Sequence, residues 1–67
     1  MISARHQFPG TVTSVKLGTV MAEVVTRVGE FEIVSAITRT SAESLALKPG
    51  DQVRVVIKAT EVMVAKD

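Results

Sequence analysis

The stretch of residues 19–28 constrains the fold of this chain most, because its apolar side chains recur with a period of two. One face of the expected strand carries Val20, Ala22, Val24, Thr26 and Val28. The opposite face is not cleanly polar, because Met21 and Val25 lie on it. A strand that is half-buried in a monomer alternates apolar with polar residues. We therefore expect the second face to be covered as well, by a subunit partner.

The size of the chain points in the same direction. A chain of 67 residues buries only about 60% of its unfolded surface, so a single core is marginal. There are no cysteines to supply disulfides or a thiolate metal site, yet 46% of the residues are apolar. We expect one domain over residues 1–67, stabilised by oligomerisation. The alternative is that the surplus aliphatic residues make a tight small barrel.

Four further segments complete the expected set of strands. Residues 11–16 are rich in β-branched side chains, residues 31–38 and 52–58 alternate, and residues 62–64 form a last short strand. Residues 7–10 contain Pro9 and Gly10 and predict a turn before the first strand. Gly18 predicts a hairpin connection or bulge, and Gly29 a tight turn.

One short helix is predicted after the third strand. Thr40 and Glu43 fit a capping box, in which both side chains satisfy amide donors at the start of a helix of about two turns. Pro49 and Gly50 end it and return the chain to a strand. These elements predict an all-β fold, a small five-stranded OB-like β-barrel with one short helix. A split sandwich is the alternative.

The composition argues against several functions. The net charge is +1 with both signs interspersed, so no basic patch for nucleic acid or membrane emerges, and no apolar run approaches about 18 residues. We expect a cytoplasmic protein. An OB-type module that binds single-stranded nucleic acid stays an alternative, although that function uses aromatic stacking platforms in a basic groove and Phe8 and Phe31 are the only aromatic residues. Catalysis is not expected, because no nucleophile is paired with a base and no metal-ligand cluster is present.

Hydrogen-bond donors gather near both ends of the chain. Ser3 and Arg5 would point to one side of an extended segment, and Lys58 and Thr60 repeat that chemistry. An arginine fork and a hydroxyl both match an oxyanion. If folding brings the two ends together, they form an anion site.

The order of short motifs resembles the molbindins, small Mop-type proteins of the Mop/TOBE domain family. The motifs are Ser3-Ala4-Arg5, Gly18-Thr19-Val20, Ala36-Ile37-Thr38, Ser41, Leu47-Lys48-Pro49-Gly50-Asp51 and Ile57-Lys58-Ala59-Thr60. The set in this order carries the resemblance, which covers nearly the whole chain. It implies an OB-like barrel and a homohexamer built as a trimer of dimers. It also implies that molybdate or tungstate binds at subunit interfaces, with the metal held only as its oxyanion and without an organic cofactor.

The resemblance also suggests which residues bind the oxyanion. Ser3, Arg5 and Lys58 would bind it directly. Thr38 and Ser41 would add hydroxyl or backbone donors near the helix start, where the helix dipole favours an anion. Backbone amides around Thr19 and Val20 are further candidates. The family often has Asn at the position of His6, so the role of His6 stays open.

The chemistry of molybdate agrees with a site made of hydrogen-bond donors. A fully deprotonated tetrahedral dianion only accepts hydrogen bonds, whereas phosphate at neutral pH partly keeps a proton that needs an acceptor. Glu61 is the one carboxylate directly beside the donors Lys58 and Thr60. Tungstate has nearly the same size and charge as molybdate, so the sequence does not choose between them. We expect storage or buffering of the oxyanion. Besides oxyanion binding and nucleic-acid binding, the third hypothesis is a structural oligomer without a ligand.

Overall fold

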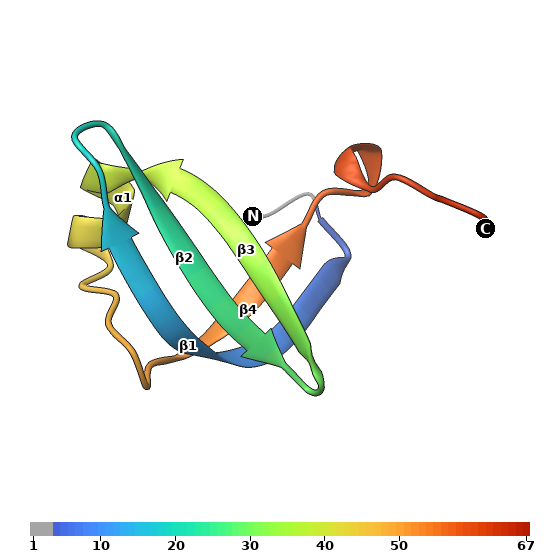
Figure 1. The fold of residues 1–67 in the computed structure, drawn as a ribbon, viewed down its shortest axis with the longest axis horizontal. Coiled ribbons are helices and arrows are strands. Elements are labelled where there is room, and N and C mark those ends of the chain that lie inside the picture. The colour runs from blue at the N-terminus through green and yellow to red at the C-terminus, as the bar shows by residue number, and fades with distance from the viewer. Residues whose placement is uncertain (1–3) are drawn as a thin grey trace.

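The computed structural model describes residues 4–67, which form a four-stranded antiparallel sheet and one short helix (Figure 1). The elements in chain order are β1 (His6–Leu17), β2 (Met21–Val28), β3 (Phe31–Thr38), α1 (Arg39–Ser44), β4 (Gln52–Ile57) and a single 3-10 turn, η1 (Ala59–Glu61). The strands lie in the order β3-β2-β1-β4. The all-β fold with one helix after the third strand is therefore confirmed, and β3 has the predicted bounds.

The long strand β1 organises the sheet because it pairs with a different neighbour along each half. Its first half pairs with β4, from His6 opposite Ile57 to Thr11 opposite Gln52. Its second half pairs with β2, from Thr11 opposite Arg27 to Leu17 opposite Ala22, with an irregularity after Val12. Figure 1 shows the bend that this change of partner requires.

The prediction of a turn over residues 7–10 is wrong, because these residues lie inside β1. Pro9 is tolerated there because this half of β1 pairs with β4 alone, so the missing N–H interrupts no second ladder. Gly10 marks a close approach of backbones. A Cβ atom at this position would lie 2.7 Å from the carbonyl oxygen of Arg27.

The core lies on the concave face of the curved sheet. Its buried members are Val12, Ala22, Val24, Thr26, Ala42 and Val55. The predicted inward face of the second strand is confirmed for Ala22, Val24 and Thr26, while Val20 precedes the strand and is 70% exposed. On the outer face Met21 remains 47% exposed. The expected cover of this face by a partner stays a prediction.

The helix begins two residues earlier than the sequence predicted. Its N-cap is Thr38, whose hydroxyl oxygen accepts a hydrogen bond from the Ser41 amide at 3.1 Å. Thr40 lies within the helix, and Glu43 faces Arg39 at 3.5 Å and does not close a capping box. The strand residue Thr38 becomes the cap because its extended backbone already places its hydroxyl over the first helical turn.

The turn that leads into β4 forms as predicted. The Asp51 carboxylate accepts hydrogen bonds from the backbone N–H and the ammonium group of Lys48, both at 3.1 Å. Gly50 has a positive φ of 96°, and its N–H donates to the carbonyl oxygen of Val12 at 2.7 Å. The turn thereby fixes the start of β4 against β1.

The fifth strand expected at residues 62–64 does not form within this chain. After η1 the backbone runs away from the sheet (Figure 1), and the side chains of Met63 and Val64 are both 94% exposed. The sheet formed by residues 4–67 is consequently open, with β3 and β4 at its two edges, and is not a closed barrel. No helix within these residues has the length and apolar character needed to cross a membrane.

Candidate functional site

Four of the sequence-predicted site residues meet where β3 passes into α1. Thr38 pairs with Met21 in the sheet, which brings the bend containing Thr19 and Val20 beside the start of the helix. All four residues are exposed. We call Thr19, Val20, Thr38 and Ser41 the helix-start cluster.

The hydrogen bonds of this cluster determine which hydroxyl is free to bind a ligand. The Thr38 hydroxyl accepts from the Ser41 amide and donates to the Ser41 Oγ at 2.8 Å, so it is engaged in both directions. Within residues 4–67 the Ser41 hydroxyl donates no hydrogen bond of its own. Ser41 is therefore the hydroxyl donor that the cluster offers, and Thr38 orients it.

Arg39 holds the bend against the helix, a role that the sequence analysis missed. Its backbone N–H donates to the carbonyl oxygen of Val20 at 2.8 Å, and its guanidinium donates to the carbonyl oxygen of Gly18 at 3.2 Å. Glu43 lies one helical turn further on, 3.5 Å from the guanidinium. The spacing of Arg39 and Glu43 is the sequence signal that could have identified this arginine.

Arg5 and Lys58 form a second group, the terminal pair. His6 and Ile57 are partners in the β1–β4 ladder, and Arg5 and Lys58 are the next residues outward, before β1 and after β4. Both are exposed, and Lys58 is the N-cap of η1 without a side-chain cap bond. The structure thus places both cations directly beyond the last pair of the β1–β4 ladder. Ser3 lies outside the described residues.

The two groups do not meet within one chain. The terminal pair lies where β1 begins and β4 ends, whereas the bend of the helix-start cluster follows the end of β1. Twelve residues of β1, at roughly 3.3 Å each along the strand, separate them. Figure 1 shows α1 and the end of β4 on opposite sides of the molecule.

His6 lies next to the terminal pair but faces an apolar environment. It is half-buried and lines a shallow hollow with Phe8, Ile57 and Val62. These neighbours offer its ring no polar side chain, and its role stays open.

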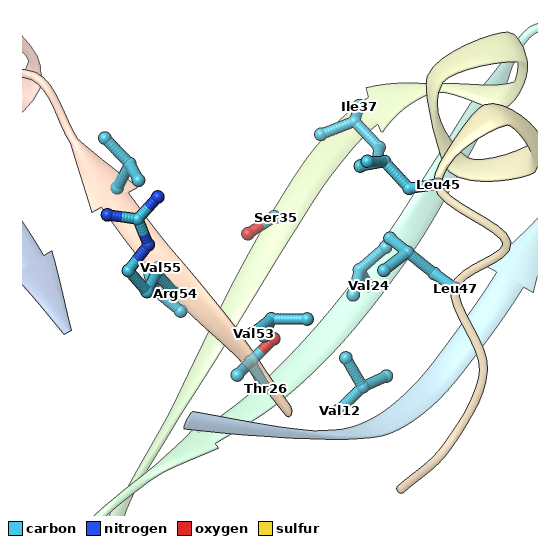
Figure 2. A pocket seen from close by; sticks show the side chains of 11 residues that line it. Val12, Val24, Thr26, Ser35, Ile37, Leu45, Leu47, Val53, Arg54 and Val55 are labelled. Carbon is cyan, nitrogen blue, oxygen red and sulfur yellow. The ribbon is translucent and has the colours of Figure 1, made fainter. Parts of the chain in front are cut away.

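A larger apolar cavity of about 220 Å³ lies on the concave face of the sheet (Figure 2). Its walls come from both edge strands, its floor from β1 and β2, and one end from the segment after α1. The lining residues include Val12, Val24, Ile37, Leu45, Leu47 and Val55. Arg54, at its margin, donates to the side-chain oxygen of Gln7 at 2.6 Å. The sequence analysis did not predict this cavity.

The candidate residues within residues 4–67 carry hydrogen-bond donors and positive charge. These residues contain no cluster of three His, Cys, Asp or Glu side chains that could hold a metal ion. Hydrogen bonds from Lys48 lower the pKa of Asp51, far from both groups of candidate residues. What the two groups offer a ligand is two cations, a free hydroxyl and exposed backbone.

Comparison with known proteins adds an independent line of argument. Residues 2–64 match the model of the TOBE domain. The molybdenum-pterin-binding protein 3 of Clostridium pasteurianum is 45% identical over 64 residues, which cover 94% of each chain.

Two solved structures extend the likeness to three dimensions. A molybdate-binding protein from Sporomusa ovata superposes with a TM-score of 0.93 and 44% identity, covering 98% of both chains. The cytoplasmic molybdate-binding protein ModG, solved with molybdate bound, superposes with a TM-score of 0.80 and 40% identity. That match covers 88% of this chain and 43% of ModG.

Proposed function

The chain belongs to the TOBE-domain family, and on this premise we propose that it binds molybdate or tungstate at interfaces between copies of itself. The proposal draws on relatives of nearly full length that are named for molybdenum or molybdate binding. It also draws on the donor chemistry of the candidate residues, which suits a dianion that only accepts hydrogen bonds.

The observation that carries the proposal is the division of the donors into two groups at opposite ends of β1. The terminal pair supplies charge, and the helix-start cluster supplies a hydroxyl and backbone. Within a single chain, an anion could contact only one of the two groups, because they lie at opposite ends of β1. A site that uses both therefore needs two chains, with the end of one strand placed against the helix start of a neighbour.

Each residue has a distinct role in this proposed site. Arg5 provides a planar fork for two oxygens of the anion, and Lys58 provides a mobile ammonium. Ser41 donates its free hydroxyl, and the backbone of Thr19 and Val20 lies within the same cluster. Ser3 completes the set.

The assembly and the cellular role belong to the same proposal. A homohexamer built as a trimer of dimers would repeat the interface and cover the exposed outer face around Met21. We propose storage or buffering of the oxyanion in the cytoplasm, without catalysis, nucleic acid or an organic cofactor. Sedimentation equilibrium tests the assembly, and a monomer at micromolar concentration would remove the interface sites.

Thermal unfolding tests the ligand. An anion that binds only the assembled native state raises the free energy of unfolding by about 2.7 kcal/mol at a hundred times its dissociation constant. For a domain of this size we expect the melting temperature to rise by about 4–8 °C for each kcal/mol. Molybdate and tungstate should both give the shift, and sulfate and phosphate at equal ionic strength should give much less.

Two outcomes of this titration would contradict the proposal. Indistinguishable melts in the four anions would mean that the donors form no selective site. The name of the Clostridium relative includes a pterin, so a pterin alone is a further arm of the titration. A shift with the pterin but not with molybdate would replace the oxyanion by an organic ligand.

A further inference from the structure

The bend between β1 and β2 offers two adjacent backbone N–H groups. Thr19 and Val20 lie in this bend, outside both strands, and both residues are exposed. Within residues 4–67 neither backbone N–H donates a hydrogen bond to the protein. The N–H of Gly18, by contrast, donates to the carbonyl oxygen of Met21 at 2.7 Å and closes the bend. The bend therefore leaves two neighbouring donors for a ligand.

Arg39 engages two carbonyl oxygens of the same bend, which lies beside α1 (Figure 1). Its guanidinium Nη1 donates to the carbonyl oxygen of Gly18 at 3.2 Å, and its backbone N–H donates to that of Val20 at 2.8 Å. The Nε atom of the guanidinium lies 3.5 Å from Oε1 of Glu43. The arginine side chain is thus held by the bend and by the helix together.

Peptide geometry converts these contacts into an orientation of the free donors. The peptide bonds of the bend are trans. In a planar trans peptide the C=O of one residue and the N–H of the next point in opposite directions. The contact from Arg39 to the carbonyl oxygen of Gly18 consequently turns the Thr19 N–H away from the guanidinium. The peptide that carries the Val20 N–H lies between two peptides whose carbonyl oxygens Arg39 holds.

We propose that Arg39 is a positioning residue for the oxyanion, because it keeps the N–H groups of Thr19 and Val20 turned toward the ligand. The inference rests on the proposed function, which supplies the ligand. Successive N–H groups in a bend form a concavity that binds anions, and donors that are already oriented bind with a smaller ordering cost. The guanidinium lies on the carbonyl side of the Gly18 peptide, so Arg39 acts through the backbone and is not itself a ligand.

Two substitutions of Arg39 separate geometry from charge in calorimetric titrations with molybdate. Arg39→Gln removes the charge, whereas Arg39→Lys keeps the charge and loses the planar fork that reaches both Gly18 and Glu43. We expect both variants to bind molybdate about tenfold more weakly, which corresponds to roughly one net hydrogen bond. An Arg39→Lys variant with the affinity of the natural chain would mean that only the charge matters, and it would overturn the proposal.

Backbone amide NMR signals show whether the loss arises in the bend. In the isotope-labelled natural chain, molybdate should shift the signals of Thr19 and Val20. In Arg39→Lys the shift of Thr19 should be much smaller, because the contact to the Gly18 carbonyl oxygen is lost while the backbone contact to Val20 remains. A general loss of stability would not single out this amide. An unchanged response of Thr19 would contradict the positioning role.

Arg27→Gln is the matched control for charge. It removes one positive charge from an exposed position at the other end of β2, where Arg27 pairs with Thr11 and Glu32. Its molybdate affinity should change little, and a loss equal to that of Arg39→Gln would assign the effect to net charge and refute the inference. A natural chain that does not bind molybdate would refute the proposed function and this inference together. A natural chain that binds molybdate no better than Arg39→Lys does would refute this inference alone.

Discussion

The sheet body and the terminal segments of this chain are held in different ways. In the body, Val12, Val24 and Val55 are buried and each strand is paired along its length with a neighbour. At the ends, Arg5, Lys58 and Val64 are exposed to solvent. The body thus builds a core from its own side chains, whereas the ends present charge and apolar surface to solvent.

Substitutions in the terminal pair should separate the two regions most clearly. Arg5→Ala or Lys58→Ala should weaken molybdate binding by about 1.5–3 kcal/mol each, because each removes a charged hydrogen bond. The melting temperature of the anion-free protein should hardly change, since both side chains are exposed. Calorimetric titration measures the first effect, and thermal melts measure the second.

Arg5→Lys is the matched variant for this experiment, because it keeps the charge and loses the planar fork. Its affinity should fall between those of the natural chain and Arg5→Ala. Equal affinities for all three proteins would remove Arg5 from the site.

A substitution in the body should show the opposite behaviour. Gly10→Ala places a methyl group 2.7 Å from the backbone carbonyl oxygen of Arg27, so β1 or β2 must move. We expect a loss of about 1–3 kcal/mol in the free energy of unfolding, measured by urea denaturation. Ser14→Ala, at an exposed position of the same strand, should change it little. If the two variants were equally stable, Gly10 would not be a point of close approach.

Gly10 also shows where sequence analysis of the fold succeeds and where it fails. The hairpin of β2 and β3 was predictable because alternation and a glycine turn are local signals. Pro9 and Gly10 carry the same local signal as a turn, yet they lie in a strand because of β4 and β2, which are distant in sequence. The segment 62–64 has strand chemistry, but no local pattern reveals whether its own chain offers an edge.

The cap of α1 belongs to both regions, because it holds the body together and orients a proposed ligand donor. Thr38→Ala removes the acceptor of the Ser41 amide and should cost about 1 kcal/mol of stability. It should also weaken molybdate binding, since Ser41 loses the neighbour that orients it.

Thr40→Ala is the control for the cap, because Thr40 is the residue that the sequence pattern favoured and it caps nothing in the structure. Its melting temperature and its affinity for molybdate should both stay close to those of the natural chain. Equal losses in both variants would restore the capping box at Thr40 and contradict the observed start of the helix.

The candidate site was predictable in its residue types but not in its arrangement. Donors near the two ends could be found by inspection, and the ladder of β1 with β4 explains why Arg5 and Lys58 both lie just beyond its last pair, His6 and Ile57. The separation of this pair from Ser41 could not be foreseen, because it depends on the length and bend of β1. The spacing of Arg39 and Glu43 indicates an ion pair on a helix, but it does not reveal that Arg39 also donates to the backbone carbonyl oxygens of Gly18 and Val20.

The smallest effect that we expect concerns the turn before β4, which belongs wholly to the body. Hydrogen bonds from the Lys48 side chain and backbone hold the pKa of Asp51 below its ordinary value of 3.8. Because the pKa of Asp51 is lower in the folded state, its ionised carboxylate stabilises the fold above pH 3.8. This stabilisation is lost as the pH falls through the pKa that Asp51 has in the folded state. Asp51→Asn should be slightly less stable than the natural chain near neutral pH, and the difference should shrink in acid below 3.8.

The same variant sharpens the distinction between body and ends. The side chain of Lys48 is 74% exposed, so the loss is small, and thermal melts across the acid range are the measurement. Molybdate affinity near neutral pH should not change, because the turn lies in neither the helix-start cluster nor the terminal pair. A stability difference that stayed constant into strong acid would mean that the carboxylate charge of Asp51 does not stabilise the turn. A loss of molybdate affinity would mean that body and ends are coupled more closely than their separate contacts indicate.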